Sequence, residues 1–366
     1  MTAVRTKERD PYFDLVKAFA MLCVVMSHFW QAAGHYSVEH VSFLANFFTA
    51  VDMPIFFMLS GMFAGRLVES GDVRRLIVRI WGYLWPAAAL AVLFAAINFF
   101  AFDKDVGQLI PLVWSLFWGK WFLIVLSYCC VLLFFYNRIK SIVWRIVFCA
   151  LVAGVLLILP DKAHINALRY MLPHFCLGLF VFRAWKVWES NLLGVLTMAI
   201  FSAVILLEGN VMTNGMGFYW ATFDVRAILS SWRAIILWAV SIMTGVCGYI
   251  AVLWVLRKFV DYCQKVEVFA SFGTTTLGVY LLHQQLLGYV ERFGFRPISF
   301  TGCLAGAVLL FLFCHYCVIG WRAVGRRWQR KGLLLDILGA QRFSSELGAE
   351  KMVKYTKRNE RIATDM

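Results

Sequence analysis

Long apolar runs separated by short polar stretches dominate the chain. A helix that spans a bilayer needs about 20 mostly apolar residues. Segments that meet this condition lie at 11–33, 41–65, 75–101, 112–135, 142–160, 168–186, 191–208, 232–256, 268–290 and 297–321. The runs lack the strict apolar–polar alternation of membrane β-barrel strands. The pattern therefore predicts an all-α membrane bundle of about ten transmembrane helices.

Composition agrees with this prediction. The chain is 61% hydrophobic and 15% charged, whereas soluble domains are about 45–50% apolar and about 25% charged. This excludes a cytosolic enzyme, a disordered chain and a secreted disulfide scaffold. The ten cysteines lie mostly inside apolar runs and show no ligand spacing with histidines. We therefore expect buried thiols and no metal site.

The net charge of +14 would suggest nucleic acid in a soluble protein. Here most lysines and arginines flank alternate ends of the predicted helices, and cytoplasmic loops collect such residues. The charge therefore predicts orientation and no nucleic-acid partner. We expect a cytoplasmic N-terminal segment at 1–10, a membrane domain at 11–321 and a cytoplasmic tail at 322–366, with both termini inside.

The first predicted helix carries three ionisable residues, Asp14, Lys17 and His28. Eleven residues at 100° each come within about 20° of whole turns, so Lys17 and His28 project from one face, roughly 16 Å apart along the axis. Asp14 lies three residues before Lys17 and can pair with it. The alternatives are that Lys17 snorkels to the cytoplasmic interface and that His28 is structural. We favour function, with both side chains in a common cavity.

These residue types suit acid–base and anion-binding chemistry. Histidine titrates near neutrality, which suits a general base. Lysine holds phosphate as a point charge. In the second helix, Asp52 lies at membrane depth, where an ionised carboxylate costs free energy and therefore needs a partner. It could orient His28, or a hydroxyl elsewhere could satisfy it. Ser60, followed by glycine, allows close backbone approach near the cytoplasmic end.

Two further pairs share helix faces. Arg75 and Arg79 are four residues apart at the cytoplasmic start of the third helix. They serve either as a topology signal or, with Lys17, as a cationic pocket for a phosphorylated cytosolic donor. Tyr280 and His283 are three residues apart on the ninth helix, at a depth compatible with His28.

Together these elements resemble the acyltransferase 3 family of integral membrane acyltransferases. The resemblance runs from residue 10 to about 320. In two respects the chain departs from the family pattern: Lys17 replaces the usual arginine, and Asp52 is offset from the family acid. The resemblance is carried by Asp14-Leu15-Val16-Lys17, Lys17-x10-His28, Phe56-Phe57-Met58-Leu59-Ser60-Gly61, Arg75 and Arg79 before Pro86, Trp121-Phe122-Leu123, and Tyr280-Leu281-Leu282-His283.

The resemblance implies transfer of an acyl group, most often acetyl, from cytosolic acyl-CoA to a hydroxyl of a glycan or lipid-linked glycan at the bacterial inner membrane. The donor would be bound by Lys17, Arg75 and Arg79, with Asp14 and Ser60 beside them. His28 would act as general base or acyl carrier. Either Tyr280 or His283 would stabilise the oxyanion.

Two other functions stay open from the residues alone. A proton-coupled secondary transporter would use Asp52 and His28 as a relay. A non-catalytic membrane subunit of an envelope assembly would need neither residue.

Overall fold

The computed structural model describes residues 10–32, 43–64, 72–101, 108–160, 162–182, 186–211, 232–263, 266–294 and 300–330. Within these ranges the chain is helical and contains no strand, which confirms the predicted all-α class. The helices are α1 (Pro11–Ala32), α2 (Phe43–Phe63), α4 (Val73–Ala101), α5 (Leu109–Trp118), α6 (Trp121–Arg138), α7 (Ile142–Ile158), α8 (Ile165–Leu177), η2 (Gly178–Phe182), η3 (Val187–Glu189), α9 (Asn191–Val211), α11 (Trp232–Tyr262), α12 (Val266–Gly273), α13 (Thr276–Arg292) and α14 (Phe300–Arg330).

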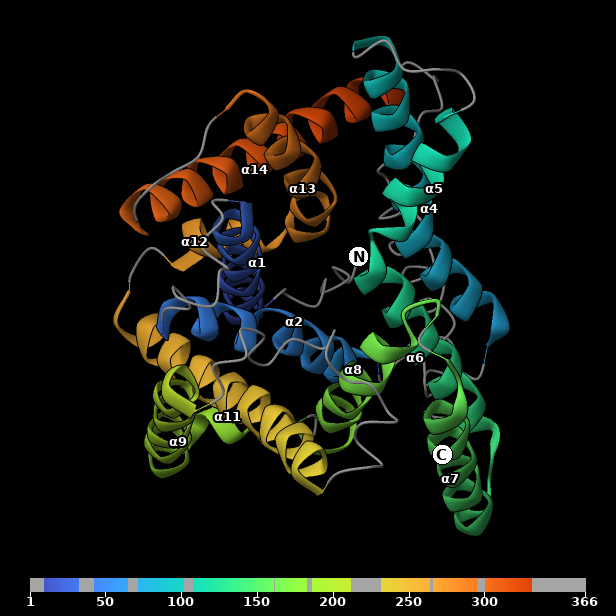
Figure 1. Ribbon diagram of the computed structural model, residues 1–366, viewed down its shortest axis with the longest axis vertical. Helices are drawn as coiled ribbons and strands as arrows, with labels where there is room; N and C mark the ends of the chain where they lie inside the picture. Colours follow the sequence, from blue (N-terminus) through green and yellow to red (C-terminus); the bar gives the residue numbers. More distant parts are fainter. Residues whose placement is uncertain are drawn as a thin grey trace, which may run out of the picture.

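The first helix forms the centre of the bundle. Figure 1 shows α1 between α13 and α14 on one side and α2 and α11 on the other, with α4 to α7 grouped further away. Residues of α1 enter two parts of the core: Val24 and Val25 pack in one apolar cluster, and Val16 and Ala20 in another. Because α1 is enclosed on several sides, polar residues on it are buried, as Asp14 and Ser27 are, or half-buried, as Lys17 and His28 are.

Two of the ten predicted helices are broken. The predicted helix 112–135 is divided into α5 and α6 by Gly119 and Lys120. Glycine has low helix propensity, and Lys120 leaves the helical region with φ −88° and ψ 41°. The predicted helix 268–290 is divided into α12 and α13 at Thr274 and Thr275, whose hydroxyls donate to the carbonyls of Ser271 and Phe272. Such local bonds compete with the helical ladder.

Apolar length supports a multi-pass membrane protein. Among the described residues, six helical stretches are long and apolar enough to cross a bilayer: α1, α4, α6, α8 with η2, α11 and α14. Shorter apolar stretches lie in α2, α5, α7 and α9. All ten predicted segments contain helix, but length and composition support six crossings, so the count of ten stays a prediction.

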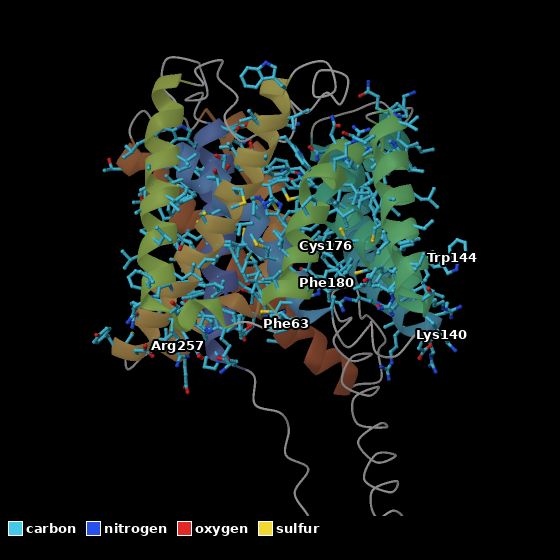
Figure 2. All side chains as sticks on the ribbon, turned by 90° about the horizontal axis from the view of Figure 1, so that it is seen from below. Phe63, Lys140, Trp144, Cys176, Phe180 and Arg257 are labelled. Atoms are coloured by element: carbon cyan, nitrogen blue, oxygen red, sulfur yellow. The ribbon has the colours of Figure 1, made fainter. Side chains whose placement is uncertain are left out.

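Two cationic residues from distant parts of the chain lie toward the same edge of the bundle. Figure 2 shows Arg257 at the end of α11 and Lys140 between α6 and α7 toward the same edge, together with Phe63 at the end of α2. The predicted topology places both cations on the inner side. The segments 1–9 and 331–366, which make up most of the predicted cytoplasmic ends, lie outside the described residues. The last helix continues past residue 321 to Arg330.

A backbone-to-backbone contact joins α2 to the α8–η2 junction. A Cβ added to Gly178 would meet the carbonyl oxygen of Met58 at 2.0 Å, and one added to Gly61 would meet that of Phe175 at 2.0 Å. Each helix therefore presents a glycine to the backbone of the other, as close helix crossings in membranes require. This contact fixes α2, and with it Ser60, against α8.

Candidate active site

A cavity of about 300 Å³ contains two of the predicted donor-binding cations. We call it the cation cavity. Lys17, Ser60, Arg79 and Tyr280 line it, from four different helices, and the remaining wall is mostly apolar. No carboxylate appears among its described lining residues. Phe63 also lines it, so the cavity lies toward the edge where Figure 2 places Lys140 and Arg257.

Both cations of this cavity are held in place by neighbours. The ammonium of Lys17 donates to Oδ1 of Asp14 at 3.0 Å and lies 5.6 Å from the ring centroid of Phe63. Asp14 is buried, and it forms with Lys17 the ion pair that their spacing predicted. Nε of Arg79 donates to the hydroxyl of Tyr83 at 2.9 Å. A bound anion would meet two oriented cations from separate helices.

Arg75 lies outside this cavity, although the same-face spacing joined it to Arg79. Its Nε is 3.7 Å from Oδ2 of Asp72 at the start of α4. One turn along the helix is enough to move the guanidinium away from the cavity lined by Arg79. The structure therefore separates the two arginines that the sequence grouped together.

His28 lines a second cavity of about 470 Å³. We call it the histidine cavity. Its wall includes Gln31 from α1, Ser115 from α5, and Gln284 and Glu291 from α13. This wall is richer in polar side chains than that of the cation cavity. Hydroxyl-bearing ligands are suited to such a wall, because amide, hydroxyl and carboxylate groups can each bond an alcohol.

The hydrogen bonds of His28 define its tautomer. The amide Nε2 of Gln284 lies 3.3 Å from Nε2 of His28, and Nδ1 of His28 lies 3.3 Å from Oε1 of Gln31. An amide nitrogen can only donate and an amide oxygen can only accept. Nδ1 therefore carries the proton, and Nε2 presents its lone pair. A lone pair at Nε2 is what a general base requires.

The prediction that Lys17 and His28 line one common cavity is wrong. They share a face of α1, but they line the cation cavity and the histidine cavity respectively. Between the two cavities lies a short chain of contacts: Gln284 on one side bonds Lys120, whose ammonium is 5.8 Å from the ring centroid of Tyr280 on the other. The α1, α6 and α13 regions thus separate a cationic chamber from an imidazole-bearing one.

Similarity to known proteins agrees with this geometry. Residues 10–320 match the family described as an acyltransferase domain, which is most of the chain. The chain belongs to the acyltransferase 3 family. No curated protein and no solved structure matched it. The acyltransferase domain ends close to where α14 leaves the bundle, so both cavities lie within it.

Two predicted catalytic residues of the acyltransferase domain lie together beside His28. The ring of His283 is 5.2 Å from that of His28 and 5.9 Å from that of Tyr280, between centroids. Nδ1 of His283 donates to the carbonyl of Val279 at 3.0 Å. Nε2 is therefore a bare acceptor, buried and without a partner among the described residues. In this tautomer His283 cannot donate to an oxyanion, whereas the hydroxyl of Tyr280 can.

Asp52 is set apart from this group. Its Oδ1 accepts the backbone N–H of Met53, and it lies near Cys23 on α1. Its neighbours Ala50 and Val51 pack in the core cluster away from His28. Because both ring nitrogens of His28 face glutamines, the structure gives Asp52 no part in orienting that ring.

Three polar residues of the acyltransferase domain were missed by the sequence analysis: Gln31, Lys120 and Gln284. Hydropathy averages hide single polar residues in an apolar run, and Lys120 lies within the predicted helix 112–135. A usable signal existed, because Lys120 directly precedes Trp121-Phe122-Leu123, and Gln284 directly follows His283.

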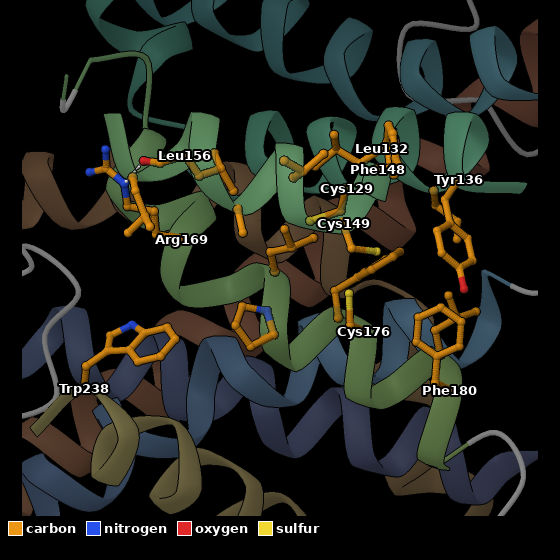
Figure 3. Close-up of a pocket in the computed structure, with 18 residues that line it drawn as sticks. Cys129, Leu132, Tyr136, Phe148, Cys149, Leu156, Arg169, Cys176, Phe180 and Trp238 are labelled. Carbon is orange, nitrogen blue, oxygen red and sulfur yellow. Dashed lines mark hydrogen bonds between the residues drawn. The ribbon is translucent and has the colours of Figure 1, made fainter. Parts of the chain in front are cut away.

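A third cavity, about 530 Å³, lies elsewhere, between α6, α7 and α8. We call it the apolar groove. Figure 3 shows Arg169 and Trp238 near one end, Tyr136 and Phe180 near the other, and Cys129, Cys149 and Cys176 between them. Arg169 donates to the carbonyls of Leu156 and Leu159 and so holds the end of α7. None of the predicted site residues lines this groove.

Proposed function

We propose that the protein transfers an acyl group, most simply acetyl, from cytosolic acyl-CoA to a hydroxyl of a cell-envelope glycan or lipid-linked glycan. The observation that supports this best is the pair of stacked cavities, one lined by Lys17 and Arg79 and the other by His28 in a base-competent tautomer. The acyltransferase domain gives the reaction class. The bacterial inner membrane is the proposed location.

In this mechanism the donor enters the cation cavity from the cytoplasmic edge. Lys17 and Arg79 bind phosphate oxygens of CoA, because both are cations held in fixed positions and no carboxylate lines the cavity to compete. The thin pantetheine arm runs along the apolar wall toward Tyr280. The thioester then arrives at the contact chain that separates the two cavities. The nucleotide part of CoA stays bound to Lys17 and Arg79.

The acceptor hydroxyl enters the histidine cavity. There it replaces the amide of Gln284 on Nε2 of His28, which removes the hydroxyl proton as oxygen attacks the thioester carbon. Gln31 holds Nδ1 and so keeps Nε2 free to accept. Exclusion of water between the cavities protects the thioester from hydrolysis.

Two measurements on the full-length protein test this function. Isothermal titration with acetyl-, succinyl- and longer acyl-CoA should show binding of at least one donor. Proteoliposomes given the bound donor, with a labelled acyl group, should transfer label to a glycolipid and polysaccharide extract of the bacterial envelope. Absence of binding by every donor, or movement of a solute without acyl-CoA consumption, would overturn the proposal in favour of a scaffold or a transporter.

A further inference from the structure

Lys120 occupies the boundary between the two cavities. Its side chain is buried, with 3% of its surface exposed. The ammonium donates to Oε1 of Gln284 at 3.1 Å and lies 5.8 Å from the ring centroid of Tyr280. Gln284 lines the histidine cavity and Tyr280 lines the cation cavity. The ammonium is therefore close to both chambers at the point where donor and acceptor must meet.

This buried cation has no counter-charge in the described part of the chain. No described carboxylate forms an ion pair with Lys120, and its one hydrogen bond goes to a neutral amide. Removing an ammonium from water without an anion costs several kcal/mol. Three N–H donors are available to it and one is used. A group that gains negative charge during the reaction would supply the missing partner.

The start of α6 adds positive potential at the same place. Lys120 is the residue before the first turn of α6, and no side chain caps that turn. The ring of Phe122, in that first turn, lies 5.3 Å from the ring of Tyr280, between centroids. A helix N-terminus carries a partial positive charge, and broken membrane helices present such ends to polar cavities. The Lys120 ammonium and the N-terminus of α6 therefore both contribute positive potential next to Tyr280.

The two imidazoles on the other side present acceptors. Nε2 of His28 accepts from Gln284, and Nε2 of His283 is buried without a partner among the described residues. The boundary thus has one proton acceptor, Nε2 of His28, on the wall of the histidine cavity, a second imidazole 5.2 Å from it, and a cation near both. Such an arrangement matches a hydroxyl that loses a proton and a carbonyl oxygen that gains charge.

We propose that Lys120 is a further catalytic residue, the cation that stabilises the oxyanion of acyl transfer; this inference depends on the proposed function. The acceptor oxygen bonds to the thioester carbon, the carbonyl π pair moves to oxygen beside the Lys120 ammonium, and the hydroxyl proton moves to Nε2 of His28. Collapse of this intermediate breaks the C–S bond, and His28 returns the proton to the thiolate. Lys120 keeps its proton throughout. It takes the role that the sequence analysis gave to His283 or Tyr280.

The test compares Lys120→Gln with Lys120→Arg in full-length protein in proteoliposomes, with acetyl-CoA and the envelope extract. Glutamine keeps a hydrogen bond to Gln284 but removes the charge, whereas arginine keeps the charge. Loss of one oxyanion donor lowers kcat by about 10²–10³-fold. We expect that loss for Lys120→Gln with the KM for acetyl-CoA changed by less than about threefold, and more than about a tenth of wild-type kcat for Lys120→Arg.

A second donor separates charge stabilisation from a structural role. Chloroacetyl-CoA has a more electrophilic carbonyl, so its transfer depends less on a cation at the oxyanion. We expect Lys120→Gln to lose at least about fivefold less activity with this donor than with acetyl-CoA. Equal losses on both donors, a raised KM with unchanged kcat, or wild-type activity would overturn the assignment.

Failure of this inference can be told apart from failure of the proposed function. If wild-type protein transfers no label from either donor, the proposed function falls. If wild-type protein and Lys120→Gln transfer label equally well while His28→Ala is inactive, only the role of Lys120 falls. Thermal unfolding of the variants in the same detergent identifies a loss that comes from misfolding.

Discussion

The two polar cavities and the apolar groove could each hold a ligand, but they differ in volume and in the polarity of their walls. The groove beside α7 is larger than either polar cavity, at about 530 Å³. Its wall is apolar, and α7, which forms one side, buries none of its described residues. The polar cavities are smaller, but cations, imidazoles and amides from α1, α4, α6 and α13 converge on them.

The candidate site is therefore indicated by polar side chains that converge from several helices, and not by the volume of a cavity. In a membrane protein an apolar groove between helices costs nothing, because lipid chains fill it. Polar groups at the same depth are expensive and persist where they are used. Lys17, Lys120 and His28 lie within one central region of the bundle, next to α1. If activity belongs to that region alone, substitutions there should lower it and substitutions in the apolar groove should not.

The largest effect is expected for His28→Ala. Without the base, kcat should fall by roughly 10²–10⁴-fold, while binding of acyl-CoA in the cation cavity should be retained. The measurement is transfer of labelled acetyl groups in proteoliposomes, together with titration of the donor. His164→Asn is the matched control, because His164 lies outside both polar cavities and has φ 62°, a conformation that asparagine tolerates. Normal product levels from His28→Ala would remove the catalytic assignment.

A smaller effect is expected for the two cations of the other cavity. Lys17→Ala and Arg79→Gln should each weaken acyl-CoA binding by about 10- to 100-fold, since a charge-assisted hydrogen bond contributes about 1.5–3 kcal/mol. Lys17→Arg should bind almost as wild type does. Titration calorimetry gives the Kd.

Arg75→Gln sharpens this prediction, because Arg75 pairs with Asp72 and does not line the cavity. Its Kd should change by less than about twofold. If Arg75→Gln and Arg79→Gln raised the Kd equally, donor binding would depend on the shared face of α4 and not on whether an arginine lines the cation cavity.

The melting temperature should be sensitive to substitution at the close contact between α2 and η2. Gly178→Ala would place a Cβ 2.0 Å from the carbonyl oxygen of Met58, and backbone cannot yield as a side chain can. Overpacking of this kind costs about 1–3 kcal/mol. The melting temperature in detergent should fall, whereas Gly154→Ala on α7, with nothing within 4 Å, should leave it unchanged. Equal melting temperatures for the two variants would contradict the close α2–η2 crossing.

The smallest effect is expected in the apolar groove. Ala153→Leu adds volume to a wall residue of the groove without adding charge. The kcat/KM for acyl transfer should stay within about twofold of wild type, because only lipid-like contacts change. A tenfold loss of kcat/KM, with unchanged melting temperature, would show that a substrate contacts the groove. The site would then not be limited to the two polar cavities.

The helices were predictable because apolar length determines them. All ten predicted segments contain helix, and the spacing of eleven residues correctly placed Lys17 and His28 on one face of α1. The breaks before Lys120 and before Thr276 were not predictable from hydropathy. Each depends on a few local bonds, such as that of the Thr275 hydroxyl to Phe272.

The site was predictable only in part. Spacing on one helix shows which residues share a face, as for Asp14 and Lys17. It does not show which turn of that helix reaches a cavity, so it could not separate Arg75 from Arg79. Contacts between helices distant in sequence, such as Lys120 with Gln284, need the fold itself. For the same reason the sequence suggested one cavity where the structure has two.

The wall between the two chambers has a consequence for the membrane as a permeability barrier. A continuous polar channel from one side to the other would leak protons and dissipate the membrane potential. Here side chains around Lys120 and Tyr280 lie between the two cavities, and a positive charge at this place also repels small cations. In the proposed function, reactants from opposite sides of the bilayer would meet at this wall while the bilayer stays electrically sealed.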